Sequence, residues 1–484
     1  MFRNIVIKEM LNSVYDFRFL IALVLCLIFI PLGFYITLSE YEQRLSEHNN
    51  SVSMYNERVQ GLINQDLPAE GYRPPSPLAV FALGLENHIP NKIITSRDGI
   101  TRYVNERGIN NPVSLLFGEI DFRVNVSIIL SLLALIFSYN IFSGEKEQGT
   151  LRQIISNSIS RTELLLAKIT GIFSMLLMPL IISIITAILV IVRMGDFHLI
   201  QGEYFPKFIT VLIVSILFVF CIFNLGVLVS TWTRRSITSI IILLLIWLMY
   251  VIAIPKLSPL IAQIIYPVKS QEVVTVEKQL LMSNLGKELS QKRDILFKNI
   301  LQEYGVNPNV FRYFSNKKRT ANENKALENY EDRRTQLENE YNDFIGNEIS
   351  KIESNYRNRR NIQITIAMNL SRLSPVSCYN YIVSELSGTG IHEIDNFMAQ
   401  AYRYQIEVEK EIYDKFKIEH YGIFNILRKP ENRSELQVPQ LNNYAFLNIT
   451  QVFQYIWIDL FLIILYIILF FSAAYVSFLR YDVR

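Results

Sequence analysis

The hydrophobic residues of this chain gather in six long runs that are separated by charged segments. A helix needs roughly 20 mostly apolar residues to cross the hydrocarbon core of a bilayer. The predicted spans cover residues 17–38, 122–143, 164–193, 207–231, 237–254 and 453–478. Any one run could be a buried core helix, but six of this length in one chain favour membrane spans. We expect a kink in the third span, because Pro179 removes one helix hydrogen bond.

Lysines and arginines of the short loops fall on one side of this six-span topology, and such loops usually face the cytoplasm. These residues are Arg3, Lys8, Lys146, Arg152, Arg161, Lys168, Arg234, Arg235, Arg480 and Arg484. The short loop on the other side, residues 195–206, has no lysine or arginine of its own. Both termini, including the tail at 479–484, are therefore predicted to be cytoplasmic. The first run lacks a small-residue cleavage pattern, so we expect it to be retained.

The same topology places two long segments outside, at 39–121 and 255–452. In the second, apolar residues recur every three or four positions from 271 to 303 and again from 330 to 356, as is typical of amphipathic helices. We expect a helical hairpin there, whose charges form a solvated face or dock a partner. In the first segment, a charged helix near 41–63 precedes an apolar stretch at 79–85, which we expect along the membrane surface. The predicted fold is an all-α polytopic membrane protein with a large helical extracytoplasmic domain between spans five and six.

Composition fits this division and excludes several classes of protein. Half of the residues are hydrophobic (50%) and 19% are charged, which is too apolar for an ordinary soluble chain of this length. The net charge of +3 gives no general case for binding nucleic acid. The histidines and cysteines have no metal-ligand spacing, and no nucleotide-binding motif is present. The glycines near 388–390 lack the lysine of a phosphate loop and predict a turn, so we expect no catalytic site, metal or cofactor.

Polar residues inside membrane spans often mark a path for a substrate. Asp459 lies a turn or two inside the sixth span, and Asn224 lies in the fourth. Both are candidates for such a path. The alternative for Asp459 is that it sits at the interface and is hydrated. The alternative for Asn224, and for Asn140 at the end of span two, is a hydrogen bond between helices.

The segment 144–163, between spans two and three, has the most informative pattern. It reads as a helix break, a charged turn, a short amphipathic helix and a second break, after which Ser160 or Thr162 can cap the next helix. Such a segment cannot insert into lipid. It has the right size to press into a groove on a soluble partner.

This segment resembles the cytoplasmic loop of ABC-2 type transporter permeases, in which E-x-E-x-G-T-L is followed by a serine, a Ser-Arg pair and a lysine. The matching residues are Glu145, Glu147, Gly149, Thr150, Leu151, Ser156, Ser160, Arg161 and Lys168. A weaker similarity points to a subgroup with a large extracytoplasmic insertion, which includes permeases tied to gliding motility and to copper-enzyme maturation. It rests on Pro77–Ala79, Gly84–Glu86, Tyr266–Val268, Ser374–Pro375 and Gly388–Gly390.

The resemblance implies a non-catalytic permease subunit of an ABC exporter, moving an unknown cargo across the bacterial inner membrane. It implies a dimer, with itself or with a paralogous permease, and a separate ABC ATPase subunit. It also implies that the loop and an amphipathic interface helix at 1–16 contact that ATPase. Membrane lipid and a periplasmic or envelope protein are the other expected partners. The long external helices motivate an alternative, a scaffolding protein that relays ATPase-driven motion to an envelope partner.

Overall fold

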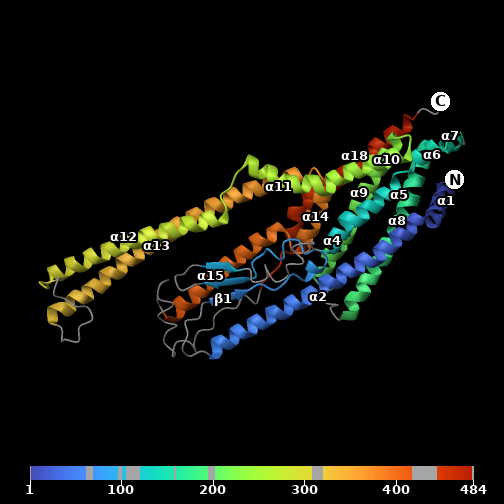
Figure 1. Cartoon of the computed structure of the whole chain (residues 1–484). Coiled ribbons are helices and arrows are strands. Elements are labelled where there is room, and N and C mark those ends of the chain that lie inside the picture. Colours follow the sequence, from blue (N-terminus) through green and yellow to red (C-terminus); the bar gives the residue numbers. More distant parts are fainter. Residues whose placement is uncertain are drawn as a thin grey trace. The chain divides into compact units, whose positions relative to one another are not determined.

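The computed structural model describes residues 2–61, 69–95, 101–104, 120–156, 160–194, 202–307, 320–416 and 444–481. Long helices dominate it (Figure 1). The chain divides into two compact units, Met1–Pro255 with Ser371–Arg484, and Lys256–Leu370. Each unit is described by itself below.

Within the described residues, 6 helical stretches are long and apolar enough to cross a membrane. They are Phe17–Arg58, Phe122–Glu147, Arg161–Arg193, Tyr204–Trp232, Ser236–Ile265 and Ile449–Leu479, here called spans one to six. The prediction of an all-α polytopic membrane protein is thereby confirmed. The loop residues 195–201 and the tail residues 482–484 lie outside the described part of the chain.

Three spans are single helices: α8 (Arg161–Met194), α9 (Tyr204–Trp232) and α18 (Ile449–Leu479). Span one is part of the longer helix α2 (Phe17–Gly61). The charged helix predicted separately near 41–63 is the second half of α2. The residues after 38 contain no helix breaker before Gly61, so nothing interrupts the helix there. α8 continues through Pro179, and the kink expected there stays a prediction.

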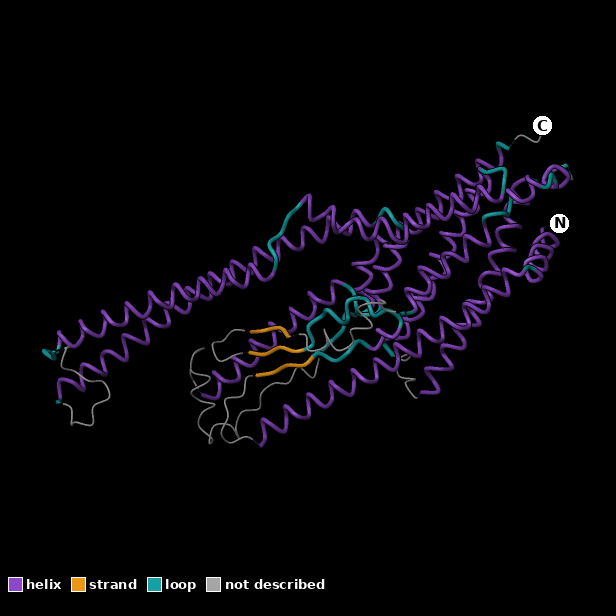
Figure 2. The backbone as a smooth tube through the Cα atoms, in the orientation of Figure 1, coloured by secondary structure: helices purple, strands orange, loops and turns teal. Residues whose placement is uncertain are grey.

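The other two spans contain turns of π-helix, and turn residues 139–142 separate α5 from α6 in span two. Figure 2 colours the helices, strands and loops along the backbone. Span two consists of α4 (Phe122–Val124), η2 (Asn125–Leu130), α5 (Ser131–Ser138) and α6 (Ser143–Glu147). Span five consists of α10 (Ser236–Leu248), η4 (Met249–Ala253) and α11 (Ile254–Ile265). π-turns inside helices often mark functional regions.

Helix α9 is the centre of the first unit and packs against α18, α5 and α14 (Pro375–Leu386). Gly226 lets α5 come close, since a Cβ there would lie 1.7 Å from Ser138 Oγ and 2.7 Å from Ser138 Cβ. Small residues at such crossings are the usual way in which membrane helices reach van der Waals contact.

The bundle has two distinct ends. α1 (Phe2–Tyr15), the segment that links spans two and three, and the last turn of α18 lie at one end, which we call the terminal end. The opposite, distal end carries the folded non-spanning segments of the first unit. They include a three-stranded antiparallel sheet of β1 (Ala69–Tyr72), β2 (Lys92–Thr95) and β3 (Thr101–Val104), in the order β1-β2-β3. The sequence did not predict this small sheet.

The apolar stretch near 79–85 does not lie along the membrane surface, and that expectation was wrong. It begins with the short helix η1 (Pro77–Val80), and Phe81 is 1% exposed. The Phe81 ring packs edge-on against Phe34 of α2, with 5.0 Å between ring centroids, and lies 5.1 Å from Phe208 of α9. These aromatic contacts bury the stretch in the core, where its burial is most favourable.

Residues of the two external segments share one packed core at the distal end. The Thr389 hydroxyl donates a 2.9 Å hydrogen bond to the carbonyl of Ala82, 307 positions away. The Ser76 hydroxyl donates to the Ser387 carbonyl at 2.6 Å. A fully buried ion pair joins Arg73 to the carboxylate of residue 86 at 3.0 Å. Both residues belong to the first segment, and breaking such a pair leaves an uncompensated charge, so the pair holds the fold of that segment.

Helix α14 lies buried between α9 and α18. Its Tyr379 ring stacks on Phe218 of α9 at 4.5 Å, and the Tyr379 hydroxyl lies 3.0 Å from the Ser215 hydroxyl. Gly388, at φ +67°, follows α14 and leads into α15 (Ile391–Phe416), so the predicted turn is confirmed.

His392, near the start of α15, has a raised pKa. Burial alone would lower the pKa of His392, but the hydrogen bond between His392 and Glu385 outweighs burial and raises that pKa.

The second unit is the predicted hairpin. α12 (Gln271–Glu303) has the expected bounds, and α13 (Ala321–Ser371) is longer than expected. The two helices run side by side (Figure 1). Ion pairs such as Lys278–Glu353, at 2.7 Å, join them, but exposed pairs of this kind contribute little. A small apolar cluster near the tip adds packing, and there the Phe297 and Tyr330 rings lie 4.8 Å apart.

The close contact at Gly226 can be tested with Gly226→Ala. The added methyl must displace Ser138, so we expect a loss of about 1–3 kcal/mol in stability. Gly286 on α12 is a matched control, because nothing lies within 4 Å of a Cβ there. Gly286→Ala should be neutral or stabilise by up to about 1 kcal/mol. Thermal unfolding in detergent measures both, and equal melting temperatures would contradict the proposed contact.

Candidate functional site

The residues of the predicted loop form two short helices at the terminal end. α6 ends at Glu147 and α7 (Thr150–Ile155) follows. Gly149 between them adopts φ +72°, which L-residues with side chains rarely adopt, so a glycine is needed at this break. Ser160 then caps α8, because its hydroxyl accepts a 3.2 Å hydrogen bond from the Glu163 amide. Residues 157–159 lie outside the described part of the chain.

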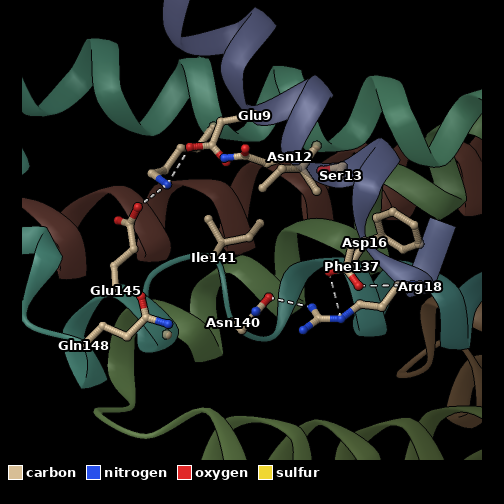
Figure 3. Close-up of a pocket in the computed structure, with 13 residues that line it drawn as sticks. Glu9, Asn12, Ser13, Asp16, Arg18, Phe137, Asn140, Ile141, Glu145 and Gln148 are labelled. Carbon is tan, nitrogen blue, oxygen red and sulfur yellow. Dashed lines mark hydrogen bonds and ion pairs between the residues drawn. The ribbon is translucent and has the colours of Figure 1, made fainter.

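A buried lysine connects this loop to the N-terminal helix (Figure 3). Lys168 of α8 is 3% exposed, and its Nζ lies 2.6 Å from Glu145 Oε1 of α6 and 2.9 Å from Glu9 Oε1 of α1. The three side chains therefore join α1, α6 and α8. Because the amine is removed from water, it needs both carboxylates to be stable there. The sequence had matched Glu145 and Lys168 to the loop pattern, but Glu9 was missed.

Neighbouring loop residues hold the link between spans four and five. The Lys146 amine donates to the carbonyls of Thr231 and, at 3.2 Å, Thr233. Glu147 Oε2 accepts a 3.0 Å hydrogen bond from the amide of Ser236, the first residue of α10. A carboxylate at the N-terminus of a helix is favourable because amides there lack partners. The loop is thus attached to the ends of both spans.

The remaining predicted loop residues differ in what they contact. Arg161 donates to the carbonyls of Leu479 and, at 3.1 Å, Tyr481, at the end of α18. Leu151 is fully buried, whereas its neighbours Arg152 and Gln153 on α7 are exposed. α7 therefore anchors one face in the protein and turns another outward.

A cavity of about 220 Å³ lies between α1, the loop and α8. Its polar wall includes Asp16 and Arg18 at the start of α2 and Asn140 at the end of span two. Arg18 lies 3.3 Å from Asp16 and donates a 2.9 Å hydrogen bond to Asn140 (Figure 3). The predicted interhelical bond of Asn140 is confirmed. The full lining is Glu9, Asn12, Ser13, Asp16, Arg18, Phe137, Asn140, Ile141, Gly144, Glu145, Gln148, Lys168 and Ile172.

The two polar candidates inside the spans have other surroundings. Asp459 is 2% exposed and receives two hydrogen bonds from Arg372, at 2.7 and 2.9 Å, so the expectation of a hydrated interface residue was wrong. Asn224 is fully buried, and its amide donates to Phe220 O of its own helix at 2.8 Å, so the expected bond between helices is not formed by that amide. Among the described residues, no hydrogen bond donor reaches Asn224 Oδ1.

Comparison with known families gives one match. A model of the ABC-2 family transporter proteins matches residues 3–483. The chain belongs to the ABC-2 transporter family. No curated protein matches it at a significant level.

Membership of the ABC-2 family gives the chain a general role. Proteins of this family are the membrane components of ABC transporters and are generally non-catalytic, which indicates a permease subunit in a membrane. Membership also implies an ABC ATPase partner and points to a dimer. Among the residues that the structure describes, no group of three His, Cys, Asp or Glu side chains could hold a metal ion.

The lysine bridge can be tested with Lys168→Met. The change leaves two partly buried carboxylates facing each other without a cation, so we expect a loss of about 3 kcal/mol or more. Lys8→Met is the control, because Lys8 is exposed on α1 and acts on Glu145 only through long-range attraction, so it should change stability by less than about 0.5 kcal/mol. Unfolding of the purified protein measures both. If Lys168→Met unfolds like Lys8→Met, the bridge does not hold α1 to the loop.

Proposed function

We propose that this chain is the permease subunit of an ABC exporter in the bacterial inner membrane, with both termini and the loop in the cytoplasm. We further propose that α1 and the loop receive the motion of a separate ATPase subunit. The observation that supports this is the Lys168 bridge, which ties the loop to α1 and α8 while α7 keeps an exposed face.

The contacts of the loop favour the transmission of its movement to the other helices of the bundle. Displacement of α6 would pull on α1 and α8 through Lys168, and on spans four and five through Lys146 and Glu147. Arg161 extends the contact to span six. Hydrogen-bonded and charged contacts of this kind transmit a rigid-body movement with little loss, because the packed elements cannot deform continuously. In this proposal Glu145, Glu147, Gly149, Thr150, Leu151, Ser160 and Arg161 shape the coupling loop and have no catalytic role.

The subgroup with a large extracytoplasmic insertion is part of the same proposal. The helices from α12 to α15 lie between spans five and six in the sequence, as that subgroup requires. Asn224 stays a candidate for the transport path, because its buried Oδ1 needs a donor that a polar cargo can supply. Asp459 is a weaker candidate, since Arg372 already neutralises it. The permease partner is a second copy or a paralogue.

The coupling assignment can be tested by charge reversal on the exposed face of α7. We expect Arg152→Glu to reduce the amount of co-purifying ATPase, or its stimulated ATP hydrolysis, by at least about tenfold. Lys298→Glu is the control, because it makes the same charge change at an exposed position of α12. Reversal of Glu145 or Glu147 would also break the Lys168 contact or the Ser236 hydrogen bond, both of which hold the loop to the bundle. Normal assembly and ATP hydrolysis in Arg152→Glu would contradict the assignment.

A second function is favoured by α13. This helix runs for 51 residues and ends at Ser371, directly before the Arg372 that pairs with Asp459 of span six. A continuous helix is stiff, so ATPase-driven motion of span six could reach the hairpin and act on an envelope partner.

An insertion of flexible residues into α13 can distinguish this relay function from simple export. Four glycines placed after Gly346, in the middle of α13, should abolish function in cells if the hairpin is a relay, while leaving stimulated ATP hydrolysis unchanged. The same insertion after Gly305 is the control, because α12 has already ended there. Full function of the Gly346 insertion, measured by complementation of a strain that lacks the chain, would exclude the relay.

A further inference from the structure

The cavity beside the lysine bridge has a charge balance that its own residues do not complete. Three carboxylates line it, Glu9, Asp16 and Glu145, against two cations, Arg18 and Lys168. Both cations already have partners: Lys168 contacts Glu9 and Glu145, and Arg18 contacts Asp16. One negative charge is therefore left over in the lining, and the nearby Lys8 of α1 acts on Glu145 from outside the lining without a hydrogen bond to it.

The surplus charge has a specific place. Lys168 occupies Glu145 Oε1, while Glu145 Oε2 is buried and has no hydrogen-bond donor in the described part of the chain. A buried carboxylate oxygen without a donor is unfavourable, and a charged donor is the strongest partner that it can gain. The cavity thus favours a ligand that carries a cation.

The size and lining of the cavity indicate which chemical class of cationic ligand it can hold. About 220 Å³ is below the roughly 300 Å³ at which small-molecule pockets begin, but it is enough for one long side chain. Asn12, Ser13 and Gln148 make the wall polar, which disfavours a lipid tail. Lysine and arginine combine an extended aliphatic stem with several donors at the tip, and fit such a cavity.

We propose that this cavity receives one basic side chain of the ATPase subunit, which places its charge at Glu145 Oε2. The inference rests on the proposed function, because α1 and α6, which wall the cavity, are the elements assigned to the ATPase contact. Docking then puts cations on both oxygens of Glu145, Lys168 from within the chain and the partner's residue from outside. The position of α6 is thereby set by the ATPase as well as by α8.

A cation supplied by the chain itself tests this. Gln148 lines the same cavity as Glu145 (Figure 3), so Gln148→Lys adds an amine to that lining. It should satisfy Glu145 Oε2, so the isolated permease should melt at a higher temperature. The same amine should exclude the partner's side chain, so affinity for the ATPase subunit that co-purifies with the wild-type chain should fall at least about tenfold.

Two controls separate this result from a general charge effect. Gln148→Met keeps the length of the side chain without its charge, and should affect neither property strongly. Gln153→Lys adds the same charge on the exposed face of α7, outside the cavity lining, and should not stabilise the isolated permease. If Gln148→Lys binds the ATPase as tightly as Gln148→Met, the inference is overturned and the proposed function stands. If no ATPase binds even to the wild-type chain, the proposed function fails as well.

Discussion

The terminal end of the bundle is organised by the amine of Lys168, which two carboxylates share. A lysine that is 3% exposed cannot keep its charge without compensation, and Glu9 and Glu145 supply it from α1 and α6. Without these two contacts of Lys168, α1 would be held to α8 only by the packing of its apolar face. α6 would then be held by its contacts with the link between spans four and five. The bridge joins the N-terminal helix and the loop to α8.

The same constraint operates at the distal end, where charge is buried in pairs. Arg372 neutralises Asp459 of span six, and Arg73 neutralises its partner in a pair that is fully buried. Buried pairs of this kind often stabilise no more than apolar residues of similar size would, but removing one partner is costly because the other charge is left without compensation. The Arg372–Asp459 pair joins residues that are 87 positions apart, whereas the Arg73 pair joins residues 13 positions apart within one external segment. The Arg372–Asp459 pair therefore ties the residue before α14 to span six, and the Arg73 pair holds the first external segment in its own fold.

The contrast between α12 and the distal sheet shows what sequence alone could predict. α12 has strong local signals: periodic apolar residues, a Ser270 cap that accepts from the Val273 amide, and Gly305 at φ +70° after its end. The strands have four residues each and pair across other segments, so no local pattern marked them. Likewise the loop motif identified Glu145 and Lys168, but their third partner, Glu9, lies 159 positions from Lys168. Such pairing depends on the folded arrangement, which periodicity does not contain.

The distribution of rigid contacts also bears on the choice between export and relay. At the terminal end, the loop contacts reach α1, α8, the link between α9 and α10, and the end of α18, so in the proposed function a push there would act on all of these elements. At the distal end, α14 is buried against α9 and α18, and α13 ends at Ser371, immediately before Arg372. A movement of α18 must therefore act on Arg372 and on the helix end beside it, whether or not cargo passes between the spans. Under the proposed function, export and relay would be two uses of one movement, and they would differ in whether the stiffness of α13 is required.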